Sequence, residues 1–93
     1  MTDKNAHSDL LLLTQAAHAA FMSRGNFNLH AQKQLVPPPA IDLPRRRWSE
    51  DQIKRQRLGQ IKSNDDGVWV EWDPEIEDFR KLPNQYKTPL PKT

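Results

Sequence analysis

The sequence predicts a mainly α chain with extended proline-rich segments and one short strand, a small irregular α+β fold completed by a partner. Only 35% of the 93 residues are hydrophobic, and the mean hydropathy is -0.89. An ordinary globular chain has about 45–50% apolar residues, and a chain of this size buries only about 60–65% of its unfolded surface. Eight prolines and no cysteine reduce the means of stabilising a core further. We therefore expect one small domain over residues 1–93, with a thin core that a partner's surface completes.

The composition also excludes several classes of protein. Without cysteine, the chain has no thiolate nucleophile, no redox disulfide and no zinc ribbon. The longest apolar run, Leu10 to Leu13, is far shorter than the ~20 residues of a membrane span. No basic leader with a cleavage site is visible at the N-terminus. We expect a cytoplasmic protein that has no membrane partner.

The clearest predicted element is an apolar helix over residues 8–25. Ser8 is a suitable N-cap, and Gly25 is placed to end the helix in the left-handed conformation. Leucine and alanine dominate the interior, and apolar residues cover more of the helix surface than one packing face requires. The helix is therefore either the centre of the core or an anchor in a groove of another protein.

A proline-rich strap and a basic arm follow over residues 36–47. Prolines fix their own φ, lack an amide hydrogen and keep their predecessors extended, which excludes a central strand. The strap is either a stiff linker or an extended recognition segment that presents Val36, Ile41 and Leu43. Its X-Pro bonds exchange slowly between cis and trans, which makes a prolyl isomerase a candidate folding helper or partner.

A basic helix is predicted over residues 49–62. Ser49 and Gln52 have the spacing of a capping box, and Trp48 and Ile53 occupy the two positions of a hydrophobic staple. Arg45–Arg47 lead into this helix, so that a basic arm precedes a basic helix.

A strand and a short helix are predicted over residues 68–82. A turn signal at residues 64–67 precedes Val68–Trp72, in which alternate residues would share a face. Because no second strong strand is visible, this strand would pair with an irregular segment or with a sheet edge of another protein. Asp73 as N-cap with Pro74 at the first helical position would start the short helix, and residues 83–93 would form an extended tail.

The charges are strongly segregated along the chain. Residues 45–62 carry a net charge of +5, and residues 63–79 carry -7. Either the two blocks pair within the chain, or they face different partner surfaces, where complementary charge guides docking.

Signals of catalysis are weak. His7, Ser8 and Asp9 are consecutive and therefore cannot converge as a catalytic triad. The three histidines are too scattered to indicate a metal site, and no glycine loop could hold phosphate. We expect no enzyme activity, no catalytic residues, no metal and no cofactor.

The apolar helix, the strap from Val36 to Pro44 and the basic entry Arg45–Trp48 together resemble the small accessory proteins of lambdoid phages. The similarity is to anti-RecBCD modifiers that bind the RecC subunit, and it covers the chain in size and general style. It implies a non-enzymatic protein in the host cytoplasm that docks on the RecBCD helicase-nuclease and alters its response to Chi, in favour of phage recombination. No functional residue is carried over from this resemblance.

The leading hypothesis is thus a protein-binding modulator of a larger host enzyme. One alternative is a small nucleic-acid-binding regulator that uses residues 45–62, with phosphates on the arginines and a base stacked on Trp48. Direct nucleic-acid binding is less favoured because the acidic block follows at once. Another alternative is a minor structural or assembly protein. Trp69 and Trp72 are core residues or secondary contacts. The predicted partner-binding residues are Val36, Pro37, Pro38, Pro39, Ile41, Leu43, Arg45, Arg46, Arg47 and Trp48.

Overall fold

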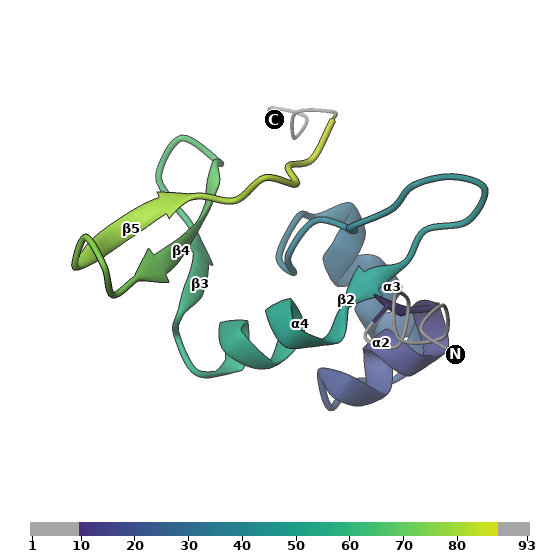
Figure 1. Ribbon diagram of the computed structural model, residues 1–93. Helices are drawn as coiled ribbons and strands as arrows, with labels where there is room; N and C mark the ends of the chain where they lie inside the picture. Colours follow the sequence, from purple (N-terminus) through teal and green to yellow (C-terminus); the bar gives the residue numbers. More distant parts are fainter. Residues whose placement is uncertain (1–9, 88–93) are drawn as a thin grey trace, which may run out of the picture.

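The chain forms three short helices and two antiparallel sheets in a computed structural model that describes residues 10–87 (Figure 1). The prediction of a mainly α chain with one strand is therefore wrong, because five short strands are present among the described residues. None of the described helices is long and apolar enough to cross a membrane. The elements in chain order are β1 (Leu10–Leu11), α2 (Leu13–Ala19), α3 (Arg24–Gln32), β2 (Trp48–Ser49), α4 (Glu50–Arg57), β3 (Ile61–Ser63), β4 (Trp69–Asp73) and β5 (Asp78–Lys81).

The predicted single helix over residues 8–25 is replaced by a strand and parts of two helices. β1 pairs with β2, with Leu10 opposite Ser49 and Leu11 opposite Trp48. α2 then covers only seven residues, and α3 starts after Ser23, whose hydroxyl accepts a hydrogen bond from the Asn26 amide. Gly25 lies in the first turn of α3 and ends no helix. The predicted N-cap, Ser8, lies outside the described residues. Within this leucine- and alanine-rich segment, Leu10 and Leu11 pair with β2 as a strand, and the helix α2 begins only after them.

All three helices end in the same way, with one residue in the left-handed conformation. After α2 this residue is Phe21, after α3 it is Gln34 and after α4 it is Gly59, with φ of 60°, 58° and 80°. In each case the next amide donates back to the third-last helical residue, as in Met22 N to Ala17 O at 2.9 Å. This is the Schellman motif, in which glycine is the usual residue because a side chain in this conformation costs about 1–2 kcal/mol.

Glycine should be more stable than alanine at the left-handed residue that follows a helix. Alanine should be more stable than glycine inside α3. Phe21→Gly should be more stable to urea than Phe21→Ala by about 1 kcal/mol, and Gly59→Ala should lose about the same amount. No atom lies within 4 Å of a Cβ built at Gly59, so the loss comes from the backbone alone. The matched control is Gly25→Ala, which should gain about 0.5–1 kcal/mol because Gly25 is helical. The same sign at all three positions would contradict the assignment.

The larger core lies under the helices. Phe27 of α3 and Trp48 of β2 pack edge to face, with ring centroids 5.2 Å apart and an interplanar angle of 83°. The first part of the strap closes this core, because Val36, Pro37 and Pro38 are fully buried. The segment is thus a wall of the core as well as an extended connection. The remaining buried members are Ala16, Ala17, Ala31 and Ile53.

The basic helix begins where the sequence predicts and ends earlier. The Ser49 hydroxyl accepts a hydrogen bond from the Gln52 amide at 3.2 Å, which confirms the predicted N-cap. The helix stops at Arg57, and Ile61 and Lys62, predicted as its last residues, belong to β3 (Ile61–Ser63). Gly59 ends the helix, and this frees the following residues to pair with β4.

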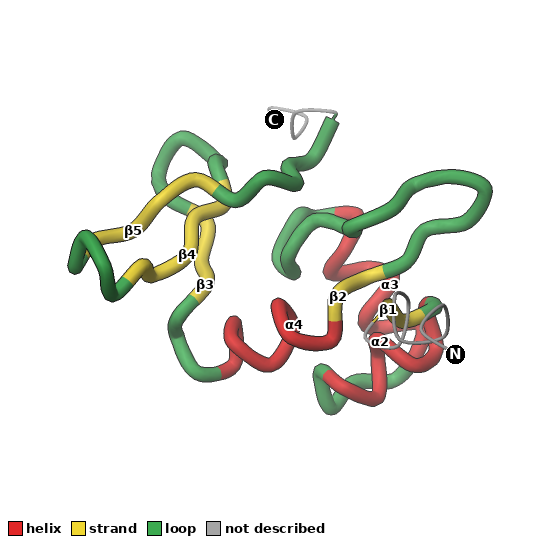
Figure 2. Tube along the Cα trace, in the orientation of Figure 1, coloured by secondary structure: helices red, strands yellow, loops and turns green. Residues whose placement is uncertain are grey.

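A three-stranded antiparallel sheet with the order β3-β4-β5 forms the other end of the molecule (Figure 2). The predicted strand is confirmed as β4, but the expectation that it pairs with an irregular segment or with another protein is wrong, since it lies between the strands β3 and β5 of its own chain. The predicted helix after Asp73 is also wrong. Residues 74–77 form a tight turn, in which Asp73 Oδ1 accepts a hydrogen bond from Glu75 N at 2.9 Å.

The two faces of this sheet differ in burial and chemistry. On the inner face Trp69 is 2% exposed and packs with Ile61 and Leu82 in a second, smaller core. On the outer face Trp72 packs edge to face against Phe79, and the Lys62 ammonium lies 4.3 Å from the Phe79 ring centroid. The alternation expected within residues 68–72 is therefore present, with the Trp69 side buried.

The described part of the tail is anchored on the strap. The Tyr86 hydroxyl donates a hydrogen bond to the Val36 carbonyl at 2.6 Å, and the Asn84 amide donates to the Pro38 carbonyl at 2.8 Å. Asn84 also exchanges hydrogen bonds with Gln52 of α4. The strap carbonyls, which no regular element pairs, thus obtain partners from a segment almost fifty residues later. The predicted tail beyond Lys87 lies outside the described residues.

Alkaline pH should weaken the fold through Tyr86. Burial raises the pKa of the Tyr86 phenol above its ordinary value of 10.0, and the nearby Arg46 offsets part of this rise. The folded state therefore favours the neutral phenol. The contribution of Tyr86 to the free energy of unfolding is complete below about pH 10 and is lost as the pH rises further. Tyr86→Phe should lose about 1 kcal/mol at pH 7 because the Val36 carbonyl loses its donor. Urea titrations from pH 8 to 11 should show a shallower decline for Tyr86→Phe than for the unmodified protein, and parallel declines would contradict this role.

Candidate protein-binding site

A loop of residues 40–47, here called the Arg loop, projects from the helical part of the molecule (Figure 1). Its base is closed by three hydrogen bonds between strap and arm: Ala40 N to Arg47 O and Arg47 N to Ile41 O, both 2.8 Å long, and Ile41 N to Arg47 O at 3.2 Å. The Leu43–Pro44 bond within the loop is cis. The Arg loop is therefore a loop whose two ends are joined by backbone hydrogen bonds. It differs from the continuous extended segment that the sequence predicted.

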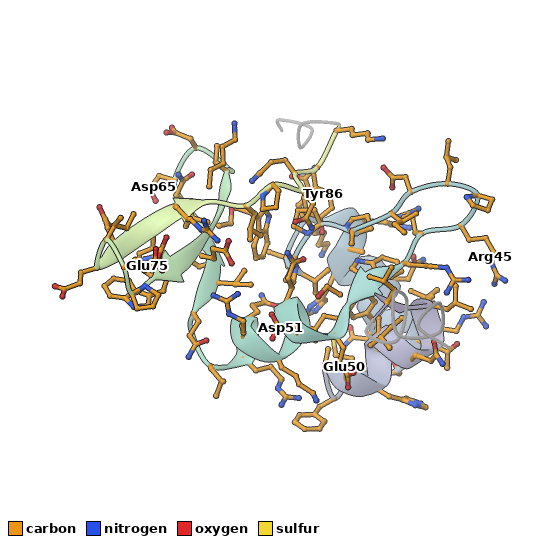
Figure 3. All side chains as sticks on the ribbon, viewed as in Figure 1. Arg45, Glu50, Asp51, Asp65, Glu75 and Tyr86 are labelled. Carbon is orange, nitrogen blue, oxygen red and sulfur yellow. The ribbon has the colours of Figure 1, made fainter. Side chains whose placement is uncertain are left out.

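The tip of the Arg loop presents an apolar side chain beside free cations. Leu43 is 80% exposed, and Arg45 and Arg46 are exposed. No carboxylate among residues 10–87 forms a salt bridge with any of the three arginines, whereas Asp42 pairs with Lys87 at 3.2 Å. Figure 3 shows Arg45 at the outer edge of the loop, directed away from the body of the molecule. Such unpaired guanidinium groups are available to an external anion.

The structure divides the predicted contact residues into three groups by their exposure. Five of them lie in the cores and present little surface: Val36, Pro37, Pro38, Trp48 and Trp69. Pro39, Ile41 and Arg47 are half-buried, while Leu43, Arg45, Arg46 and Trp72 are exposed. The Trp48 ring packs against Phe27 and is buried, so it offers no face on which a nucleic-acid base could stack. The available contact surface narrows to the Arg loop and, separately, the outer face of the sheet.

Two pockets flank the Arg loop, and Arg46 contributes to both. The first, of about 160 Å³, is bounded by Leu12, Leu13, Asn28, Arg45, Arg46 and Trp48. The second, of about 330 Å³, is bounded by Ala31, Gln34, Pro39, Asp42, Arg46, Gln85, Tyr86 and Lys87. The sequence did not indicate Leu12, Leu13 or Asn28 as site residues, because Leu12 and Leu13 come near the arm through the pairing of β1 with β2, and Asn28 comes there on α3, which packs on α2. That pairing involves two residues on each strand and leaves no periodic signal.

The acidic block lies away from the Arg loop. Figure 3 places Asp65 and Glu75 at the sheet end of the molecule, opposite Arg45. The first alternative for the charge blocks, pairing within the chain, holds in part. Arg55 of the basic helix pairs with Glu71 at 2.9 Å, whereas the arginines of the Arg loop pair with no carboxylate of the described residues. The molecule therefore has a cationic end and an anionic end.

Within residues 10–87, no cluster of three or more histidine, aspartate or glutamate side chains is placed so that it could bind a metal ion. No protein-family model matches the chain, and neither a curated protein nor a solved structure is significantly similar to it. The resemblance to phage accessory proteins therefore stays a prediction, and the candidate site is assigned from geometry alone.

Proposed function

We propose that this protein is a non-enzymatic binding module that docks through the Arg loop on an acidic surface of a larger protein and thereby modulates it. The supporting observation is the display, on a hydrogen-bonded base, of Leu43 beside Arg45 and Arg46, which form no salt bridge with residues 10–87. An apolar anchor with flanking arginines is typical of the residues that dominate protein–protein affinity. Complementary charge then raises the rate of association and selects the partner.

The chemistry of the loop favours a protein over a nucleic acid. The aromatic residue beside the loop on which a single-stranded ligand would stack, Trp48, is only 3% exposed and offers no face for stacking. The anionic sheet end would repel a long phosphate backbone that extended beyond the loop. A leucine at the tip, in contrast, gains most from an apolar depression in a protein surface.

The first partner to test is RecBCD, through RecC, because the sequence resembles lambdoid-phage modifiers of that enzyme. Docking there would alter the response of the helicase-nuclease to Chi. This identity depends on the resemblance alone, whereas the general assignment of a protein-binding loop depends on the geometry.

Binding should be measured with the purified full chain and RecBCD, and with proteins captured from a bacterial lysate and identified. Arg45→Ala/Arg46→Ala should weaken binding about tenfold or more and reduce its dependence on salt. The control is Arg24→Ala/Lys33→Ala, which removes the same charge from exposed positions at the two ends of α3. Equal affinities of the two variants for the partner would contradict the role of the loop. Recovery of the chain alone from the lysate, together with no binding to RecBCD, would contradict the function.

The nucleic-acid alternative is distinguished by the same variants. It predicts binding of single- or double-stranded DNA that weakens steeply with salt and that depends on the arginines of the loop. We expect no such binding at physiological salt.

A further inference from the structure

The smaller pocket beside the Arg loop, here called the Leu–Arg pocket, is lined by both apolar and cationic side chains. Leu12 and Leu13 are half-buried beside the buried ring of Trp48, and Arg45 and Arg46 complete the boundary. At about 160 Å³ the pocket has the scale of one side chain and is too small for a helix or an extended ligand. Its size and charge therefore suit one side chain of a ligand together with a neighbouring negative charge.

We infer that the Leu–Arg pocket holds an apolar side chain of a partner protein whose next residue is glutamate or aspartate. The apolar side chain would lie on the leucines, and the carboxylate would pair with the guanidinium groups of Arg45 and Arg46. Ion pairs of this kind are frequently bidentate, and this adds geometric selectivity to the attraction. The inference rests on the proposed function and specifies the local sequence that the partner presents.

Unused hydrogen-bonding capacity supports this assignment independently of the arginines. The indole N–H of Trp48 is buried and has no acceptor among the described residues. Asn28, a half-buried residue on the boundary, makes no side-chain hydrogen bond to the described residues. Polar groups of buried sites are normally paired, so their exceptions need an explanation. A partner backbone or carboxylate at the pocket would supply an acceptor to the Asn28 amide.

The larger neighbouring pocket is a poorer candidate because its polar groups other than Arg46 are largely engaged. Lys87 pairs with Asp42, and the Tyr86 hydroxyl donates to the Val36 carbonyl. Gln85 bonds to the backbone of Trp69 and Leu82. An anion bound by Lys87, Tyr86 or Gln85 would have to displace internal contacts, whereas Arg45 and Arg46 at the Leu–Arg pocket have no salt bridge with the described residues to displace.

Three short peptides test the inference with the full chain. We choose N-acetylated, C-terminally amidated Gly-Leu-Glu-Gly, with Gly-Leu-Gln-Gly and Gly-Ala-Glu-Gly as matched probes that lack the charge or the apolar side chain. Binding is followed by nitrogen–proton correlation spectra, in which the indole signal of Trp48 and the side-chain amide of Asn28 report on the pocket. The Leu-Glu peptide should bind at least about fivefold more tightly than either control peptide and shift both signals.

Two protein variants verify the location. Asn28→Ala and Arg45→Ala should each weaken binding of the Leu-Glu peptide several-fold, with the rest of the spectrum unchanged. Lys33→Ala, which removes an exposed charge after α3, should have no effect. Equal binding of the three peptides, or shifts confined to Trp72 and its neighbours, would overturn the inference. Tighter binding of N-acetylleucine than of the peptide would also overturn it, because the ligand would then be a small carboxylate.

The experiments distinguish a failure of the Leu–Arg pocket from a failure of the proposed function. Loss of partner binding in Arg45→Ala/Arg46→Ala without any binding of the Leu-Glu peptide would retain the function and refute the pocket. Binding of the peptide without any protein partner would refute the function while the pocket remained.

Discussion

Trp48→Ala is expected to lower the free energy of unfolding by about 4 kcal/mol, as the loss of a fully buried tryptophan usually does. The ring is 3% exposed and packs against Phe27 in the larger core. A chain of this length has a total stability of about 5–14 kcal/mol, so much of the stability would be lost. Urea titration followed by circular dichroism measures the effect.

Trp72→Ala is the matched control, because it removes the same ring from a position that is 38% exposed. It should cost about 1 kcal/mol, mainly through the cross-strand contact with Phe79. Equal losses in the two variants would contradict the burial of Trp48. A surface role for Trp48 would give the opposite pattern, with normal stability and weakened partner binding.

Glu71→Ala is the second large effect, with an expected loss of about 2–3 kcal/mol. Glu71 is 7% exposed, and its two carboxylate oxygens contact Arg55 at 2.9 Å and Arg80 at 3.2 Å. Removal of one partner from a buried ion pair usually costs about 3–5 kcal/mol. The loss should be smaller here because both guanidinium groups are partly exposed and can be hydrated in the variant.

The control for this prediction is Glu50→Ala, which breaks the exposed pair between Glu50 and Lys54 within α4. Such pairs contribute about 0.3–0.5 kcal/mol. A further distinction comes from salt. The difference between Glu71→Ala and the unmodified protein should persist at 1 M NaCl, where exposed pairs are screened. A loss at Glu71 no larger than that at Glu50 would show that the pair does not join α4 to the sheet.

Local chemistry made some elements predictable. The start of α4 depends on Ser49 and the amide three residues later, so the signal and the contact are adjacent in the sequence. The turn before β4 is similar, since Asn64 Oδ1 accepts from the Asp66 and Val68 amides. The alternation within β4 followed from its own residues. Each of these features needs no knowledge of the rest of the chain.

Other elements were unpredictable because their signals are shared or absent. An aspartate followed by proline suits both a helix start and a tight turn, since in either case Asp73 accepts a hydrogen bond from a nearby amide. β5 contains Asp78, Arg80 and Lys81 and so lacks the pattern of a strand. β5 forms because it pairs in register with β4, and the residues of β5 alone do not indicate this pairing.

The candidate site shows the same division. The arginines and Leu43 were recognised from the sequence because their charge and the prolines around them stand out. The burial of Val36, Pro37 and Pro38 was missed, since it depends on the tail that covers them and on the core behind them. A proline-rich segment presents the same residues whether it lies on a partner or on its own chain.

The bonds from the tail to the strap also bear on how the protein is made. Val36 and Pro38 leave the ribosome long before Tyr86 and Asn84, which are separated from them by 50 and 46 positions. During synthesis the strap can approach the helices, but its carbonyls remain without these donors until residue 86 has been added. The helical half therefore cannot reach its final state in the N-to-C order in which domains usually fold. Maturation of the half that carries the Arg loop is thus tied to the arrival of the last described segment.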